Sequence, residues 1–177
     1  MIQVDNNIIL RLPNDNDKHS VAKYANNYNI WMNLTDTFPF PYTLVDACNF
    51  IEYCKNTQSE LNLCIELNND CIGLIGIIFK TGIYRYCGTM GYWLAEPFWN
   101  KGVMTKVAKT FVKYIFNNKD ITRIESSVFE WNTGSMRVLE KTGFKLECVS
   151  KKAIFKNNQF VDEYKYSLLK EEWQGIQ

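Results

Sequence analysis

The sequence has little of what metal sites and many catalytic sites require. It contains one histidine, His19, among 177 residues, and its six cysteines include no C-x-x-C pair. A cysteine–histidine zinc site is therefore not expected, and neither is a cysteine nucleophile that a histidine activates. The G-x-S-x-G and Walker motifs are also absent. The sequence thus predicts no bound metal and argues against hydrolase and nucleoside-triphosphatase activity.

An excess of one charge and long apolar runs are lacking as well. The chain has 20 Lys and Arg against 19 Asp and Glu, a formal net charge of +1, and no basic block. Electrostatics therefore give no reason to expect a nucleic-acid partner. No apolar run approaches membrane-spanning length, and the N-terminus lacks a basic-then-apolar signal segment. We expect a soluble, cytoplasmic protein without a membrane partner, whose cysteines are free thiols.

What is present is typical of a globular protein. Hydrophobic residues make up 46% of the chain and aromatic residues 15%. No segment repeats and no linker-like composition divides the chain, so we expect one domain over residues 1–177. The element order predicted below is β-α-α-α-β-β-β-α-β-α-β-β. It favours a mixed sheet with helices packed on it, in the α/β or α+β class.

Apolar periodicity, interrupted by proline, glycine and asparagine, divides the chain into these elements. Strands are expected at residues 8–12, 61–67, 71–79, 86–95 and 121–129, and in a final hairpin formed by 144–149 with 153–155 and by 160–169. Helices are expected at residues 14–27, 28–34, 43–54, 103–115 and 132–142. Thr43 with Asp46 is close to a capping box. The proline-containing segment before it, residues 38–42, either lines a pocket or covers the core.

The stretch from residue 91 to residue 106 organises the rest of the chain. It begins as a strand, Pro97 ends the strand, and Lys101-Gly102 turns into an amphipathic helix. The apolar positions of that helix share one face and are predicted to be buried: Val103, Val107, Phe111 and Tyr114 or Ile115. The unpaired N–H groups at the helix start suit a phosphate or pyrophosphate. The alternative is that Gly102 is only a turn glycine.

A second helix starts after a strand at Asn132–Ser135. If the two strands are neighbours, both helix starts open at the same end of the sheet, where open sheets hold ligands. Asn132 can equally be an ordinary N-cap, and Ser135 can serve the helix alone. Four carboxylates are possible bases, although most should be solvated or ion-paired: Glu66, Glu96, Glu125 and Glu130.

These segments resemble a known superfamily. The run from Gly91-Tyr-Trp-Leu through Pro97-Phe-Trp to Lys101-Gly-Val-Met-Thr105 resembles the acyl-CoA-binding motif of the GNAT superfamily of N-acyltransferases. Asn132-x-x-Ser135-x-x-Val-Leu-Glu-Lys-x-Gly-Phe144 resembles that superfamily's second motif. Residues 38–47, together with residues 156–163 and Glu172-Trp173, are similar to the RimJ/RimL-like branch of ribosomal-protein N-acetyltransferases. The match extends from residue 8 to residue 173 in order and spacing.

The resemblance implies a fold, a cosubstrate and a set of roles. The fold would be a mixed, mostly antiparallel sheet of about seven strands flanked by about four helices. The backbone N–H groups of Lys101, Gly102, Val103, Met104 and Thr105 would bind the pyrophosphate of acetyl-CoA. The strand edge from Tyr92 through Trp93 to Leu94 would pair with the pantetheine amides, and the Leu94 N–H would polarise the thioester carbonyl. Asn132 would hold the pantetheine arm, with Ser135 near the leaving sulfur.

Three residues depart from the superfamily's pattern. Asn100 stands where glycine is common, and Met104 stands where glycine or alanine is usual, so the phosphate loop is expected to be tighter or partly altered. Leu139 occupies the place where many members carry a tyrosine that protonates the departing thiolate. Ser135 is then the nearest candidate acid, directly or through a water. The alternative is that the thiolate leaves unassisted.

The predicted activity is transfer of an acetyl group from acetyl-CoA to a primary amine, by direct attack in a ternary complex. The absence of histidine from the matched motifs, with at most a weak base such as Glu66 or Glu125, favours a peptide N-terminal α-amine or a small-molecule amine over lysine. A second hypothesis is a non-catalytic acyl-CoA-binding protein of the same fold. A nucleic-acid-binding module is disfavoured by the near-neutral charge. The protein is expected to be a monomer or a homodimer.

Overall fold

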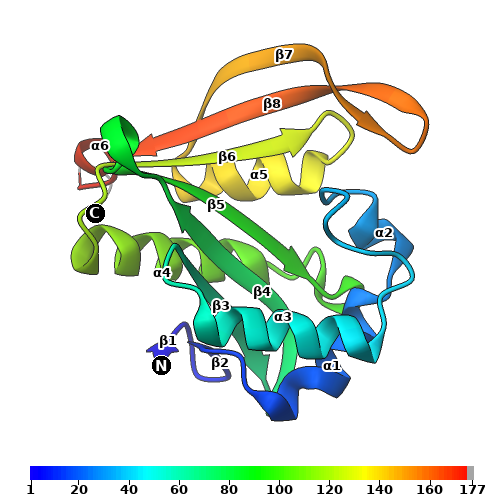
Figure 1. Ribbon diagram of the computed structural model, residues 1–177. Coiled ribbons are helices and arrows are strands. Elements are labelled where there is room, and N and C mark those ends of the chain that lie inside the picture. Colours follow the sequence, from blue (N-terminus) through cyan, green and yellow to red (C-terminus); the bar gives the residue numbers. More distant parts are fainter. Residues whose placement is uncertain (175–177) are drawn as a thin grey trace.

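The alternating apolar segments form one eight-stranded sheet in the order β1-β2-β3-β4-β5-β6-β8-β7. The computed structural model describes residues 1–174 (Figure 1). The strands are β1 (Ile2–Gln3), β2 (Ile8–Arg11), β3 (Glu60–Leu67), β4 (Asp70–Phe79), β5 (Cys87–Leu94), β6 (Arg123–Phe129), β7 (Lys145–Lys156) and β8 (Gln159–Leu169). The α-helices are α1 (Lys18–Ala25), α2 (Tyr28–Trp31), α3 (Leu44–Asn56), α4 (Val103–Asn118), α5 (Thr133–Thr142) and α6 (Lys170–Gln174).

The predicted class is confirmed, with small differences in count. All neighbouring strands pair antiparallel except β5 and β6, which run parallel. Within residues 1–174 there are eight strands and six α-helices, against seven and five predicted from the sequence pattern and about seven and about four implied by the resemblance. The differences include the two-residue strand β1 and the five-residue helix α6. Such short elements carry too few apolar repeats to be recognised from periodicity.

The hairpin turns between β3 and β4 and between β7 and β8 are two-residue turns made of asparagine. Asn68 and Asn69 have φ of 52° and 66°, and Asn157 and Asn158 have φ of 49° and 59°. A two-residue turn between twisted antiparallel strands requires positive φ at both positions, and asparagine tolerates that region better than most residues. The sequence predicts turns at both sites that are one residue longer. The observed turns are shorter because Asp70 and Lys156 already belong to the paired strands.

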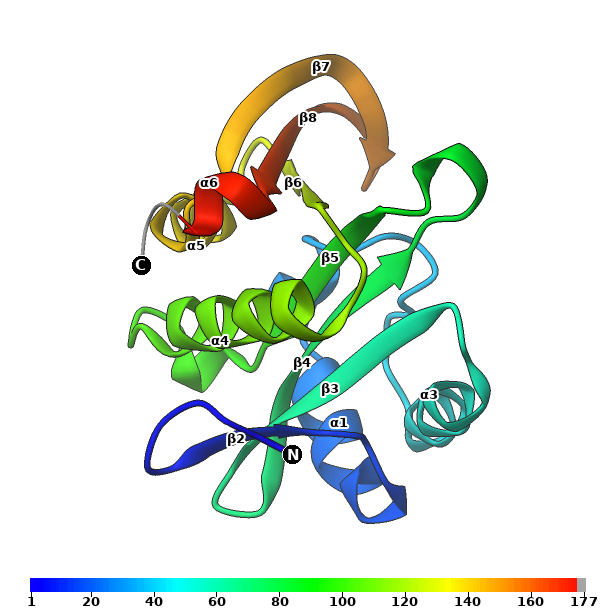
Figure 2. The same cartoon turned by 90° about the vertical axis from the view of Figure 1, so that its left-hand side faces the viewer.

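Helices cover both faces of the sheet. Figure 2 shows α4 on one side of β3, β4 and β5, and α1 and α3 on the other. The face of α4 that packs on the sheet consists of Met104, Val107, Ala108, Phe111, Val112, Ile115 and Phe116. Val107, Phe111 and Ile115 confirm the prediction, whereas Val103 and Tyr114 are only half-buried. The buried stripe instead starts at Met104, one position after Val103.

Gly73 allows two strands to approach closely. A β-carbon added there would lie 2.4 Å from the carbonyl oxygen of Trp93, so β5 leaves no room for a side chain. The β3–β4 register is irregular at the same place, between Cys64 and Glu66. Glycine inside a strand is typical of such a close approach of two backbones.

The expectation that all cysteines are free is wrong for two of them. Cys64 and Cys71 form a disulfide, while Cys48, Cys54, Cys87 and Cys148 are free. The turn at Asn68-Asn69 folds β4 back on β3 and brings the two α-carbons to 5.6 Å. Sequence spacing missed this pair because it depends on hairpin register, not on a short cysteine motif.

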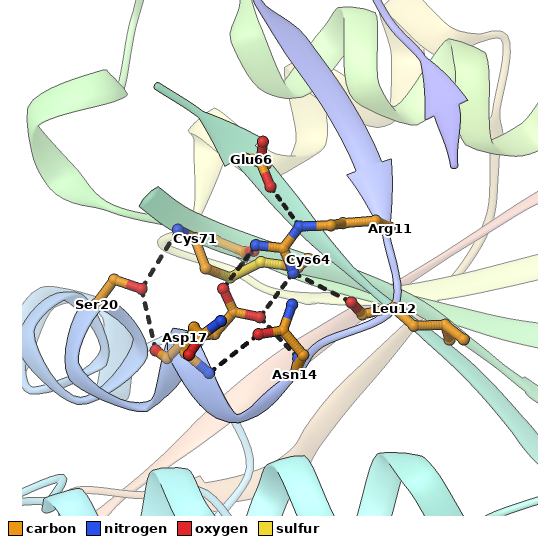
Figure 3. A network of polar contacts seen from close by, with 10 residues as sticks. Arg11, Leu12, Asn14, Asp17, Ser20, Cys64, Glu66 and Cys71 are labelled. Carbon is orange, nitrogen blue, oxygen red and sulfur yellow. Dashed lines mark hydrogen bonds and ion pairs between the residues drawn. A yellow bond between two sulfur atoms is a disulfide. The ribbon is translucent and has the colours of Figure 1, made fainter. Parts of the chain in front are cut away.

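A buried ionic network lies beside the disulfide (Figure 3). The Arg11 guanidinium donates two hydrogen bonds of 2.7 Å to the two carboxylate oxygens of Asp17 and a third to Glu66. Asp17 also accepts from the backbone N–H of Asn14 at 2.8 Å, and it is only 2% exposed. The network thereby fixes the start of α1 to the end of β2 and to β3.

No helix in the described part of the chain is long and apolar enough to cross a membrane. The cytoplasmic location stays a prediction.

Candidate active site

The two parallel strands at the centre of the sheet separate after a short contact. β5 and β6 pair only from Cys87 to Thr89 and from Arg123 to Glu125, whereas β5 stays paired with β4 over its whole length. Residues 90–94 of β5 and 126–129 of β6 are therefore not paired with each other, and Figure 1 shows the two strands diverging; the separation between their backbones is called the gap below. The two strands are neighbours, as the sequence argument required, and the gap lies at their carboxyl ends.

Backbone groups of β5 line one side of this gap. The Ala95 N–H bonds to the Ile72 carbonyl, so odd-numbered residues of β5 direct their N–H and C=O groups toward β4. Tyr92 and Leu94 therefore direct theirs toward the gap, while the backbone of Trp93 is committed to β4. The Leu94 carbonyl accepts a hydrogen bond of 2.6 Å from the Trp99 indole N–H. The Leu94 N–H remains available on the gap side.

The start of α4 is an anion-binding geometry. Gly102 is the N-cap with φ of 74°, and a β-carbon there would meet nothing within 4 Å. Lys106 N–H is the first in the helix to bond back, to Gly102, so the N–H groups of residues 103–105 have no partner within the helix. The positive end of the helix dipole adds to them. These donors suit a pyrophosphate.

Two of the departures from the expected motif are explained here. Asn100 has φ of 58°, so it adopts the left-handed conformation that glycine usually provides. Met104 is 7% exposed and packs in the core, away from the loop. Neither side chain therefore removes an N–H group from the start of α4.

The start of α5 presents a serine to a partly buried tyrosine. Asn132 is the N-cap, and its side-chain oxygen accepts from the Ser135 N–H at 3.1 Å. Tyr92 reaches across from β5, and its phenol oxygen lies 2.8 Å from the Ser135 Oγ. Burial raises the pKa of Tyr92, while the hydrogen bond with Ser135 opposes the rise. Leu139, one turn further on, is fully buried in the core.

The contact of Tyr92 with Ser135 was not predicted. The sequence assigned Tyr92 a role through its backbone only, and periodicity says nothing about a phenol that spans two elements. The sequence contained one indirect signal. Because position 139 is a leucine, a tyrosine hydroxyl in contact with Ser135 had to come from another element.

The candidate bases are held by cations or amides. Glu66 belongs to the Arg11 network, which lies on β2 and β3 and not at the gap. Glu96 accepts hydrogen bonds from the side-chain amides of Asn27 and Asn29, at 2.7 and 3.0 Å. The expectation that most carboxylates are ion-paired or solvated therefore holds for these two, and Glu130 is exposed.

Glu125 is held by two cations. Lys80 and Arg123 both donate to it, and Arg123 also donates to Glu147. Burial acts against ionisation, but these bonds hold the pKa of Glu125 below its ordinary value. The hydrogen bond from Arg123, helped by Ser167, lowers the pKa of Glu147 from 4.5 to about 2. Glu125 is consequently a weak proton acceptor at neutral pH.

The ion pairs of Arg123 with Glu125 and Glu147 predict that the protein loses stability in acid. Because the folded-state pKa values of Glu125 and Glu147 are depressed, their contribution to stability is complete above about pH 4.5 and is lost as pH falls toward about 2. Arg123→Gln is expected to unfold more readily at neutral pH and to lose less further stability on acidification. Thermal unfolding midpoints of both proteins between about pH 5 and 2 test this. Parallel losses in the two proteins would contradict it.

The segment around α2 joins the ends of both separated strands. Asn27 and Asn29 bond to Glu96, which follows β5, and Asn33 accepts from the indole N–H of Trp131, which follows β6, at 3.1 Å. Figure 1 shows α2 beside these strand ends. The neighbouring segment, residues 38–42, was expected either to line a pocket or to cover the core. Its Phe38 packs on Trp93 and Tyr42, which favours covering the core.

The β7–β8 hairpin also contacts this segment. Lys156 is 3% exposed, places its ammonium 3.9 Å from the Trp31 ring centre, and donates to Asp36 at 2.8 Å. The residue is far from Trp31 in sequence, so its contact could not be inferred from local pattern. Together with Trp131, it connects the β6–β8–β7 part of the sheet to α2.

The separation of β5 and β6 beside the start of α4 is a geometry that suits an extended ligand with a phosphate group at one end. Residues 7–145 match the acetyltransferase (GNAT) domain family. The uncharacterized N-acetyltransferase YnaD of Bacillus subtilis is 32% identical over 162 residues, which are 89% of this chain and 90% of that protein. The chain therefore belongs to the GNAT family, and it is an acyl-CoA-dependent N-acetyltransferase by class.

Solved structures with the same fold include the branch that the sequence resembled. One is RimL, a ribosomal-protein α-N-acetyltransferase in complex with coenzyme A, with a TM-score of 0.84 at 18% identity. The match covers 95% of this chain and 97% of the RimL chain. Spermidine N-acetyltransferase from Vibrio cholerae, in complex with CoA and spermine, has a TM-score of 0.82 at 19% identity, with 96% and 99% covered. At these identities the likeness concerns the fold.

Proposed function

We propose that this protein transfers the acetyl group of acetyl-CoA to a peptide or protein N-terminal α-amine or to a small-molecule amine. The observation that carries the proposal is the gap between β5 and β6, because it leaves the N–H groups of Tyr92 and Leu94 free beside the start of α4. RimL acts on an α-amine and the Vibrio cholerae enzyme on spermidine, so this fold accommodates both acceptor types.

Each residue of the site then has a proposed role. The N–H groups of residues 101–105 bind the pyrophosphate, and the edge formed by Tyr92 and Leu94 pairs with the pantetheine amides. The Leu94 N–H polarises the thioester carbonyl, where negative charge develops during attack. Asn132 orients the pantetheine arm, and Ser135 lies near the leaving sulfur. Trp93 supports this edge through its side chain, which is 8% exposed and packs on Phe38.

The acceptor is argued from its protonation state. An α-amine of pKa near 7.8 is about one-third neutral at pH 7.5, whereas a lysine of pKa near 10.4 is neutral only about once in a thousand molecules. A lysine would therefore need about 3.5 kcal/mol from a base or a desolvating pocket. The carboxylates considered as bases include Glu66, Glu96 and Glu125, and all three already accept hydrogen bonds from other side chains. An amine that is already partly neutral fits this site best.

A survey of acceptors tests the proposal. Thiol release from acetyl-CoA would be measured with free peptides, peptides whose α-amine is blocked but which contain lysine, and small amines. We expect higher kcat/KM for α-amines or small amines of similar pKa. For an α-amine, kcat/KM should rise with pH to about 8 as the neutral fraction grows, then level off. A preference for the lysine side chain would contradict the proposal.

The remaining expectations are parts of the same proposal. We propose one domain over residues 1–177 that acts as a monomer or homodimer in the cytoplasm, without metal and without a nucleic-acid or membrane partner. Tight binding of acetyl-CoA by calorimetry, with no thiol released for any amine, would instead favour the non-catalytic acyl-CoA-binding protein. The conformations of Asn100 and Met104 weaken the reasons for that alternative.

A further inference from the structure

The hydroxyl of Ser135 lies at the start of α5 and is contacted from strand β5. Its own backbone N–H donates to the side-chain oxygen of Asn132, which fixes the first turn of α5. From the opposite side of the gap, Tyr92 places its phenol oxygen 2.8 Å from the Ser135 Oγ and 3.3 Å from the Ser135 carbonyl oxygen. A single tyrosine on β5 thus contacts the hydroxyl and the carbonyl oxygen of one residue on α5.

The chemistry of the two hydroxyl groups indicates which of them donates. A phenol is a much stronger acid than an aliphatic alcohol, so in a phenol–alcohol pair the phenol is the better donor and the alcohol the better acceptor. The 2.8 Å contact to Oγ has the usual O–H···O length, whereas the 3.3 Å contact to the carbonyl is long. Either hydroxyl could donate in the short contact, and on this argument we assign the Tyr92 proton to it, which leaves the Ser135 proton available to another acceptor.

We propose that Tyr92 is a positioning residue for acetyl transfer: by donating to the Ser135 Oγ it directs the Ser135 hydroxyl proton toward the sulfur that leaves acetyl-CoA. The inference rests on the proposed function, because it requires the thioester to lie in the gap between β5 and β6. It assigns a role to the Tyr92 side chain in addition to the backbone edge of the same residue.

Tyr92 gives up no proton in the acetyl transfer. The neutral amine nitrogen forms a bond to the carbonyl carbon, the carbon–sulfur bond breaks, and its electron pair stays on sulfur. The nitrogen loses one proton to solvent and the thiolate takes one up from solvent, giving the amide and free coenzyme A. During bond breaking, Ser135 donates a hydrogen bond to the sulfur and Tyr92 donates to Ser135.

Burial explains why Tyr92 orients and does not ionise. Its pKa is raised because the phenol is desolvated, so a phenolate there is disfavoured and the phenol remains a donor through the reaction. The residue one turn beyond Ser135, Leu139, is fully buried and has no hydroxyl to offer. Tyr92 is therefore the side chain in contact with Ser135 that can set the direction of its proton.

The test compares Tyr92→Phe, Ser135→Ala and the double variant. We expect kcat to fall about tenfold in Tyr92→Phe and about thirtyfold in Ser135→Ala, with the dissociation constant of acetyl-CoA within about twofold of wild type. The double variant should be no slower than Ser135→Ala, since Tyr92 acts through the serine. Ser135→Thr, which keeps the hydroxyl, should recover most of the rate.

Two further measurements separate positioning from general support of the structure. With an acetyl donor whose sulfur is replaced by selenium, the leaving group is a weaker base, so the loss in Tyr92→Phe should shrink. Urea unfolding of the ligand-free variants should show losses that are less than additive, which reports the contact without any turnover.

Tyr166→Phe is the matched control. Tyr166 is buried, and its hydroxyl donates to Glu140 at 3.3 Å, so the variant also loses one tyrosine hydrogen bond but outside the site. It should keep the wild-type kcat. Unchanged kcat in Tyr92→Phe, additive rate losses in the double variant, or an equal loss with the selenium donor would overturn the inference. Absence of acetyl transfer by the wild-type protein to any amine would instead overturn the proposed function.

Discussion

Replacing Asp17 by alanine is expected to lower the free energy of unfolding by about 3 kcal/mol. Asp17 is 2% exposed and accepts both forked hydrogen bonds of Arg11, whose own side chain is 16% exposed. Without the carboxylate, the guanidinium stays buried with Glu66 as its remaining acidic partner, and the Asn14 N–H loses its acceptor. Breaking one side of a buried ion pair usually costs about 3–5 kcal/mol, and Glu66 keeps the value at the lower end. Urea unfolding measures the change.

Asp15→Ala is the control for this prediction. Asp15 lies two residues away and pairs with Lys55, but its side chain is 79% exposed. Solvent screens such a pair, so the variant should change stability far less than Asp17→Ala does. Equal effects of the two substitutions would show that the Arg11 network does not contribute as a buried pair.

Replacing Gly102 by valine is expected to raise the dissociation constant of acetyl-CoA about tenfold or more. Gly102 has φ of 74°, a region that costs a residue with a β-carbon about 1–2 kcal/mol. The loop is expected to relieve that strain by shifting, which moves the N–H groups of residues 103–105 away from the pyrophosphate. Isothermal titration calorimetry with acetyl-CoA measures the loss.

Gly82→Val is the control that separates the effect of backbone strain on stability from the loss of acetyl-CoA binding. Gly82 has φ of 62°, and a β-carbon there would also meet nothing within 4 Å, but it lies between β4 and β5 at the end opposite the gap. It should lose similar stability and keep its affinity for acetyl-CoA. If Gly102→Val loses stability to the same extent but binds normally, the anion site does not lie at the start of α4.

Local signals in the sequence identified the elements that form the candidate site. Thr43 with Asp46 forms the expected capping box, Asn132 caps α5, and Gly143 ends it with φ of 103°. Ile124, Ser126 and Val128 share a buried face of β6, and their alternation is a pattern that the sequence itself contains. These features depend on residues within a few positions of each other, so one segment contains the information that specifies them.

Contacts between distant segments were missed for the opposite reason. The Cys64–Cys71 disulfide depends on hairpin register, and the hydrogen bond between Tyr92 and Ser135 joins residues 43 apart. The contact of Lys156 with Asp36 joins residues 120 apart. A composition or periodicity argument treats each segment alone, so it cannot say which side chains meet when the sheet closes.

By itself, the sequence determined the family, the order of the elements and the helix start that would hold the pyrophosphate, because motif spacing and capping residues act locally. Only the tertiary structure decided that β5 and β6 separate after Thr89, that Glu66 and Glu125 are held by cations, and that Tyr92 reaches Ser135. Those features arise from strand order and from the packing of helices on the sheet, which bring together groups that are far apart along the chain.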